Sequence, residues 1–273
     1  MELIENSPDD HADLEKAVAL LLSPTITARL TGFVGKPVEK ILAYLPDGIE
    51  GKLNDLVKVA LSKAADAALW SLGNEPSKSA SPLWNKTLAG ISGGAGGFFG
   101  FTGLAFELPV STSVMMRAVA DIARSEGFDL DDPETKKSCI EVFALGGESE
   151  DDDEVETAYY AMRIFTMEVA GSISIKGAST ASRVGLAPAQ LGKWLSELIE
   201  KVAARFGVVI SEKVAAQAIP VIGAVGGAAI NMMFTDFYQD MARGHFIVKR
   251  LENKYGFDEI KKEFENIKRA KNL

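Results

Sequence analysis

The chain has 273 residues and a net charge of −9, which argues against general nucleic-acid binding because the phosphate backbone would repel such a surface. Its one cysteine, Cys139, excludes an intrachain disulfide, and its apolar surroundings predict a packed core residue rather than a nucleophile. The acidic N-terminus lacks the basic and apolar regions of a secretory signal. We therefore expect a cytoplasmic protein, or one bound peripherally to the cytosolic face of the inner membrane.

Capping and turn signals divide the first third of the chain into short helices. Apolar residues recur at helical spacing over 8–22, 24–34, 37–45 and 49–72. Helix starts are predicted where Ser or Asp precedes proline, at Ser7, Ser23, Ser81 and Asp132, because the side chain can cap and proline needs no donor there. The turn-rich residues 73–81 suggest a boundary between an N-terminal helical region, 1–72, and a helical core, 82–273, within one compact unit.

Further helices are predicted over most of the remaining chain. The ranges are 82–104, 107–126, 133–145, a segment through Tyr159 and Val169, 188–206, 209–254 and 258–270, with a break of 209–254 near Pro220 as an alternative. The helix 107–126 should stop at Gly127, and an acidic connector, 148–156, should precede Tyr159. Strand signals are nearly absent. The expected fold class is all-α, a single helical bundle built around two glycine-rich, charge-free helices.

Those two helices come from charge-free runs of unusual composition. The first lies between Lys86 and Glu107 and contains seven glycines, and the second lies between Lys213 and Asp236. Glycine inside a helix costs about 0.5–1 kcal/mol relative to alanine, so these glycines should allow close helix packing in return. Their small-xxx-small spacing permits this packing. Candidate contacts for an apolar ligand or a membrane are Gly93, Gly97, Phe98, Phe99, Phe101, Gly223 and Gly227.

Three interpretations of the runs remain open. They form the buried centre of a soluble bundle, which we favour, or a sheltered helical hairpin that inserts into a membrane, or permanent transmembrane spans. Permanent spans are least favoured because the runs are weakly apolar and their flanks lack a Lys/Arg asymmetry and aromatic belts.

Charged residues at the ends of the runs form the second candidate site. If the glycine-rich helices pack together, their end residues could form one polar cluster, either a structural ion-pair network or a functional site. The alternative is that these residues lie on separate solvated faces. Glu107 is the best single candidate because a carboxylate beside an apolar segment tends to have a perturbed pKa. The candidate cluster comprises Glu107, Arg117, Asp121, Asn231, Asp236, Asp240 and Arg243.

Several classes of site lack their sequence signals. No phosphate-binding loop or dinucleotide fingerprint is present, and neither histidine stands in a di-iron or zinc pattern. An EF-hand spacing is also missing from the acidic connector. We therefore expect no metal and no cofactor.

Three stretches together resemble the EcsC protein family. They are 90–126, a Gly-aromatic-Asp turn that begins at Gly127, and a late Pro-x-x-Gly-x-x-x-Gly-x-x-x-Asn helix. The late motif is the most specific and corresponds to Pro220, Gly223, Gly227 and Asn231. Glu107 stands where the family more often has an aspartate. The resemblance covers about residues 50–255 and implies a bacterial protein linked to membrane transport, with a membrane transporter as a partner and no established catalytic residue.

Three functions follow as hypotheses. The leading one is an accessory protein that binds a membrane surface or an apolar ligand, with the glycine-rich hairpin contacting acyl chains and the mixed-charge C-terminal helix facing headgroups. The second is a hydrolase that uses Glu107, Asp236 or Asp240 as acid or base, which requires these carboxylates to converge. The third is a purely structural helical oligomer. The oligomeric state itself stays open.

Overall fold

The computed structural model describes residues 4–37, 40, 42–43, 45, 49–71, 100–145, 159–163, 188–219 and 223–271. Within these ranges the regular elements are all helices, which confirms the predicted all-α class. In chain order they are η1 (Ile4–Asn6), α1 (Pro8–Leu21), α2 (Ile26–Val34), α4 (Ile49–Ser71), α6 (Gly100–Ser125), α7 (Pro133–Glu141), η2 (Val142–Ala144), α9 (Pro188–Gln217), α10 (Gly223–Tyr255) and α11 (Phe257–Lys271).

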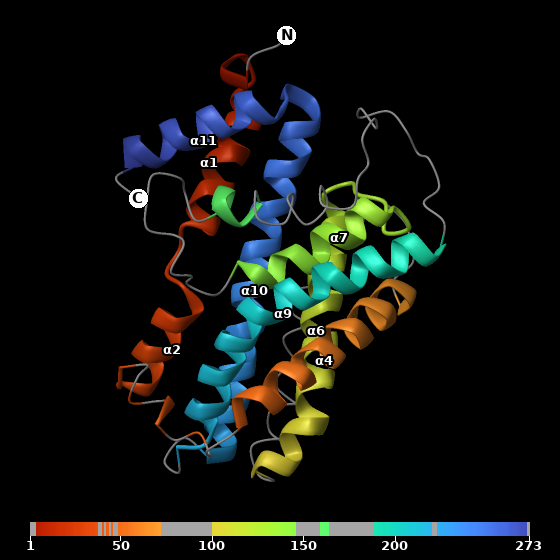
Figure 1. The fold of residues 1–273 in the computed structure, drawn as a ribbon. Helices are drawn as coiled ribbons and strands as arrows, with labels where there is room; N and C mark the ends of the chain where they lie inside the picture. The colour runs from red at the N-terminus through yellow and green to blue at the C-terminus, as the bar shows by residue number, and fades with distance from the viewer. Residues whose placement is uncertain are drawn as a thin grey trace.

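Helix α10 is the long central element, and α6 lies beside it in the same direction (Figure 1). Near their beginnings Asn231 contacts Glu107, and near their ends Arg250 contacts Glu126. Both helices therefore start at the same end of the molecule. The two helices are parallel neighbours, and most of the first glycine-rich run, residues 87–99, lies outside the described residues.

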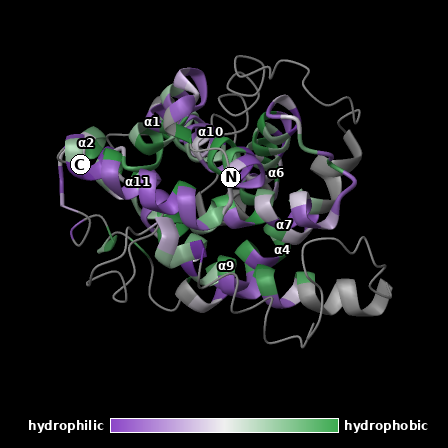
Figure 2. Cartoon of the chain, turned by 90° about the horizontal axis from the view of Figure 1, so that it is seen from above, coloured by the Kyte–Doolittle hydropathy of each residue, from purple (hydrophilic) through white to green (hydrophobic). Residues whose placement is uncertain are grey.

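The main core lies where α4, α6, α9 and α10 meet, with α2 and α7 closing its sides. Phe143, Phe206 and Tyr238 pack at its centre with ring centroids 5.0–5.6 Å apart. A smaller apolar cluster joins α1, α11 and the second half of α10. Viewed from above, α11 is coloured largely as hydrophilic (Figure 2), and it buries Ile260, Phe264 and Ile267 against the bundle.

Two predicted helix boundaries differ from the structure. The first is the gap predicted between residues 104 and 107, which α6 spans without a break, with Pro109 inside the helix. The second is near residues 207–208, where α9 runs without a break to Gln217. At the first boundary, Pro109 removes only one helical hydrogen bond. At the second, Gly207 of α9 lies close to Asn54 of α4. In both places the helix continues through residues that disfavour it.

The capping predictions were partly right. Asp132 caps α7 by accepting a hydrogen bond from the Glu134 amide at 3.3 Å. At the start of α2 the cap is Thr25, not Ser23, and its hydroxyl accepts from the Ala28 amide. The Ser7 hydroxyl donates to Asp10 and makes no capping bond. The Ser81 prediction lies outside the described residues.

The end of α6 matches its prediction. Gly127 has φ 91°, the Phe128 amide donates to the Ala123 carbonyl, and the Gly127 amide donates to the Arg124 carbonyl. These two bonds form a Schellman motif, which requires a residue that tolerates positive φ. Glycine at this position therefore ends the helix.

The described close approach of two helices at a glycine occurs where α1 crosses α10. A Cβ added to Gly244 would lie 2.6 Å from Leu21 Cγ and 3.1 Å from the Ala17 carbonyl oxygen. The absence of a side chain at Gly244 therefore permits this crossing. Sequence patterns did not indicate this crossing, because Gly244 stands outside both glycine-rich runs.

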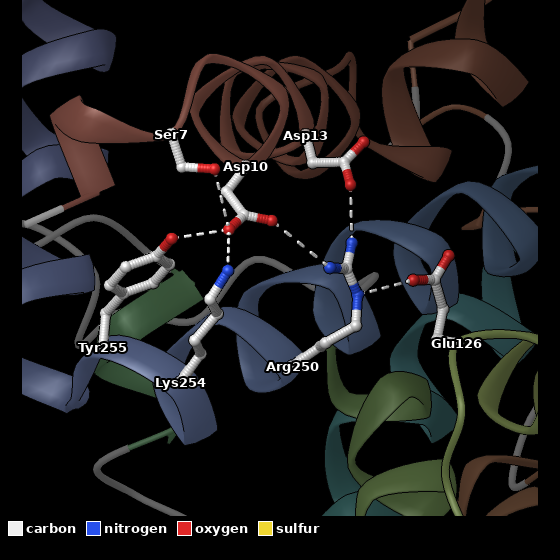
Figure 3. A network of polar contacts seen from close by, with 7 residues as sticks. All are labelled: Ser7, Asp10, Asp13, Glu126, Arg250, Lys254 and Tyr255. Atoms are coloured by element: carbon white, nitrogen blue, oxygen red, sulfur yellow. Dashed lines mark hydrogen bonds and ion pairs between the residues drawn. The ribbon is translucent and has the colours of Figure 1, made fainter. Parts of the chain in front are cut away.

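A network of charged residues fastens the other end of α1 to α10 (Figure 3). Asp10 accepts hydrogen bonds from Lys254 at 2.6 Å and from Tyr255 at 2.5 Å. Arg250 donates to Asp13 at 2.6 Å and to Glu126 of α6 at 3.2 Å. The hydrogen bonds from Lys254 and Tyr255 lower the pKa of Asp10 below its ordinary value of 3.8.

We expect this lowered pKa to make the α1–α10 contact sensitive to acid. A carboxyl whose pKa is lower in the folded state stabilises the fold above its unfolded pKa, and the contribution is lost as the pH falls through its folded pKa. Asp10→Asn should therefore unfold at lower urea concentration than wild type at neutral pH, and the difference should vanish in acid. Asp9→Asn, an exposed neighbour, is the control. A difference that is equal at both pH values would contradict the prediction.

Candidate functional site

Three helices bring a lysine, a glutamate and an asparagine together in the interior. Glu107 comes from α6, Lys213 from α9 and Asn231 from α10, and none of them is more than 6% exposed. The Lys213 ammonium donates to Glu107 Oε1 at 2.9 Å, and Asn231 Nδ2 donates to the same oxygen at 2.9 Å. We call these three residues the buried triad.

Each remaining proton of Lys213 also has a suitable neighbour. The ammonium lies 3.4 Å from the Ser111 hydroxyl and 5.6 Å from the centroid of the Phe234 ring. Burial raises the pKa of Glu107, but the charge of Lys213 and the hydrogen bonds from Lys213 and Asn231 outweigh it, so the net pKa is lowered. Glu107 is therefore ionised, and the triad holds one negative and one positive charge.

The chain segments on one side of the triad carry few charged residues. We define the apolar end as residues 100–116 of α6, residues 214–219 at and just beyond the end of α9, and residues 223–235 of α10, in which Glu107 is the one charged residue. Its charge is neutralised internally by Lys213. Among the described side chains of the apolar end, the exposed ones are Val110, Ala218 and Met232. The exposed side chains that are described in these three segments are thus apolar rather than charged.

The other members of the predicted polar cluster lie elsewhere. Asp121 pairs with Arg124 one turn along α6, and Asp240 lies 3.7 Å from Arg29 of α2. Asp121 is fourteen residues beyond Glu107, about 21 Å along the helix, and Asp240 is nine beyond Asn231, about 13 Å. Arg117, Asp236 and Arg243 are half-buried. The structure therefore joins Glu107 to Asn231 and separates both from Asp121 and Asp240.

This separation bears on the hydrolase hypothesis. Glu107 is engaged by a lysine, and Asp240 faces Arg29 on another side of α10. Within the described part of the chain, no group of three or more His, Cys, Asp or Glu residues could hold a metal ion. The geometry thus does not favour Glu107 and Asp240 as a shared acid–base pair.

Most of the apolar candidate residues of the first run lie outside the described part of the chain. Gly93, Gly97, Phe98 and Phe99 lie outside the described residues, and of Phe101 only the backbone, within α6, is described. Gly223 begins α10, and Gly227 is buried one turn before Asn231. Glycine at 227 therefore lies next to the buried triad.

A second buried polar group lies at the other end of α10. Tyr159 contacts His245 Nδ1 at 3.1 Å, and Glu141 lies 3.8 Å from His245 Nε2. Burial, followed by the charges of Lys249 and other cations, lowers the pKa of His245 well below its ordinary value, so the ring is neutral. Lys249 donates to the Ser138 hydroxyl at 2.7 Å. These bonds tie α7 and residues 159–163 to α10.

Cys139 is buried beside this group, as predicted. Burial raises the pKa of its thiol to about 12, so it stays protonated and unreactive at neutral pH.

Comparison with protein families decides the identity of the chain. The model of the EcsC protein family matches residues 14–251. The chain belongs to this family. The match confirms the resemblance seen in the sequence and extends it toward the N-terminus to include most of α1 and all of α2. No curated protein and no solved structure matched the chain.

Sequence reasoning missed one member of the triad of this EcsC protein. Lys213 served there only as the boundary of the second charge-free run. The signal that could have identified it is its position: a lysine at the start of one such run and a glutamate at the end of the other can neutralise each other if the runs pack together.

Among the described helices, no single one combines the length and the apolar character needed to cross a bilayer. Helices α1 and α2 taken together, with a 51° bend between them, satisfy both requirements.

Proposed function

We propose that this EcsC protein is an accessory protein that binds membrane surfaces through its apolar end. The observation that carries the proposal is the surface of that end. Val110 is 50% exposed and Met232 is 42% exposed, and the one charged residue of these segments is buried in an ion pair. A water-facing helix end ordinarily presents charged side chains, and an exposed apolar surface suits contact with acyl chains.

The mixed-charge helix α11 does not take part in this contact. It lies at the opposite end of the molecule, beside α1 (Figure 1). Tyr255, just before α11, follows Asn231 by 24 residues, about 36 Å along α10. Because α11 and the apolar end lie at opposite ends of the molecule, they cannot contact one membrane surface together. The headgroup role that was expected for the C-terminal helix is therefore not part of the proposal.

Binding should not require anionic lipids. The protein is acidic overall, so an anionic membrane would repel it, while the exposed apolar side chains need no counter-charge. A link to a membrane transporter, which the family resemblance implied, would place the same end against the membrane-embedded surface of that partner.

Liposome flotation tests the proposal. Wild type should float with neutral vesicles at low and high salt. Val110→Glu and Met232→Glu should float several-fold less, because a carboxylate resists transfer into the apolar layer. Val59→Glu is the matched control, since Val59 of α4 is 46% exposed and should float as wild type does. A wild type that fails to float with neutral vesicles, or glutamate variants that float equally well, would contradict the proposal.

A further inference from the structure

Residues 159–163 pack against α10 and α11 through two aromatic side chains. Tyr159 stacks on Phe264 of α11 with ring centroids 5.6 Å apart, and Tyr160 meets the same ring edge-on at 5.2 Å. Tyr159 and Tyr160 are at most 3% exposed, and both belong to the smaller apolar cluster. On α10 the Tyr159 ring also lies edge-on to the ring of His245, which is fully buried. Residues 159–163 therefore help to keep both His245 and Phe264 away from water.

The hydrogen bond between Tyr159 and His245 depends on the protonation state of the imidazole. The Tyr159 hydroxyl lies 3.1 Å from Nδ1, and the Glu141 carboxylate lies 3.8 Å from Nε2. Because the carboxylate favours the ring proton on Nε2, Nδ1 is the acceptor and the phenol is the donor. Burial raises the pKa of Tyr159, so the phenol keeps the proton that it donates. A second ring proton, on Nδ1, would therefore displace this hydrogen bond.

Charged groups from three parts of the chain lie around the His245 ring. They are Lys137, Glu141 and the exposed Glu134 of α7, Arg163 of residues 159–163, and Lys249 and Glu252 of α10. Glu141 and Glu134 each lie 3.6 Å from Lys137. Glu252 pairs with Arg163. Lys249, in contrast, donates to the neutral hydroxyl of Ser138. A protonated His245 would thus add a positive charge beside Lys249, where each of these carboxylates already engages another cation.

These surroundings set the direction of the pH dependence. The docked His245 ring is neutral, because burial and then the neighbouring cations hold its pKa well below its ordinary value of 6.5. Once water reaches the ring, it takes up a proton below about pH 6.5. The docked arrangement is therefore favoured above that pH and loses this advantage as the pH falls below it. Burial raises the pKa of Glu252, so Glu252 favours docking in acid and offsets part of the effect.

We propose that the contact between Tyr159 and His245 is an acid-sensitive latch, which holds residues 159–163 on α10 at neutral pH and releases them in mild acid. Release uncovers Phe264 and exposes the two tyrosine rings that pack on it, so apolar surface becomes accessible beside α11. The latch lies in the second half of α10, away from the apolar end, and does not depend on membrane binding.

Hydrogen exchange of the full-length protein at about pH 7.5 and about pH 5.0, corrected for the intrinsic exchange rates, tests the latch. The open fraction at the amides of residues 159–163 should rise by up to about thirtyfold at the lower pH, the limit for a group whose ordinary pKa is 6.5. Helix α9, which contains no histidine, is the internal reference and should change far less. Equal protection of residues 159–163 at both pH values, or an equal loss of protection in α9, would overturn the proposal.

Two histidine variants separate the latch from other acid effects. His245→Asn retains an acceptor near the position of Nδ1 but does not titrate in this range, so acid should no longer increase exchange at residues 159–163. His11→Asn is the matched control, because His11 is partly exposed and contacts Glu263 of α11. This control should respond to acid as wild type does. An acid response that persists in His245→Asn, or disappears in His11→Asn, would contradict the latch.

Nuclear magnetic resonance of the wild-type histidine rings decides the question should His245→Asn fail to fold. The chain has two histidines, so the His11→Asn spectrum assigns both ring signals. The His245 ring should titrate with a midpoint below 6.5 and in step with the exchange of residues 159–163. A midpoint at or above 6.5, or a titration that leaves residues 159–163 protected, would show that His245 does not control their release.

Discussion

Lys213→Met should destabilise the protein by about 3–5 kcal/mol, because it leaves the buried Glu107 carboxylate without its counter-charge. Methionine has a volume similar to that of lysine, so the loss of stability comes from the missing charge rather than from a cavity. Urea unfolding near neutral pH measures it as a lower midpoint with an unchanged slope. The double variant Glu107→Gln with Lys213→Met should recover most of the loss, because both charges are then absent.

The pH dependence should change sign as well. In wild type Lys213 and Asn231 lower the pKa of Glu107, so this residue's stabilisation is present above its unfolded pKa and lost as the pH falls through its folded pKa. Without Lys213, burial alone should raise that pKa, and the variant should lose stability as the pH rises from the unfolded to the folded pKa.

An exposed ion pair provides the matched control. Lys58 lies 3.0 Å from Glu200, whose side chain is 68% exposed, and Lys58→Met should cost less than about 1 kcal/mol. A Lys213→Met variant that is no less stable than Lys58→Met would show that the triad does not hold Glu107 as described.

Gly244→Ala should destabilise the protein by about 2 kcal/mol, the range expected when a methyl group is forced into a packed helix crossing. The new Cβ would meet Leu21 Cγ at 2.6 Å and the Ala17 carbonyl oxygen at 3.1 Å. Neither neighbour is the free end of a flexible side chain, so α1 must move away from α10. Thermal and urea unfolding both measure the change.

Gly32, another glycine within a helix, is the control for Gly244→Ala. Gly32 lies within α2, and a Cβ added there would have nothing within 4 Å. Gly32→Ala should therefore leave stability unchanged or raise it by about 0.5–1 kcal/mol, because alanine favours the helix. If both variants shift stability in the same direction, the close approach at Gly244 is not what limits that position.

The local elements were largely predictable because their causes lie within a few residues of each other. Apolar spacing identified α1, α2, α4 and α11 nearly to their bounds, and Gly127 marked the end of α6 through its positive φ. Boundaries failed where a helix continues through residues that disfavour it. Pro109 continues α6, and α9 runs past Gly207, which packs beside Asn54.

The candidate site was half predictable. Glu107 stood out because a carboxylate directly follows a charge-free run, and Asn231 because it completes the late motif of the EcsC family. Their contact depends on α6 and α10 being parallel, which helical periodicity does not determine. Lys213, separated from Glu107 by 106 positions in the chain, was identified only from the fold.

The sequence by itself determined the helical class, the family and the two charge-free runs, since composition, spacing and motif are local properties. Only the tertiary structure decided which charges neutralise each other and which helix ends lie together. A single parallel packing of α6 on α10 buries Glu107 beside Lys213 and leaves Val110 and Met232 exposed at the apolar end, while α11 is carried to the opposite end. Long-range pairing fixes these relations because burial makes an unpaired charge costly, and no local pattern records which partner will be present.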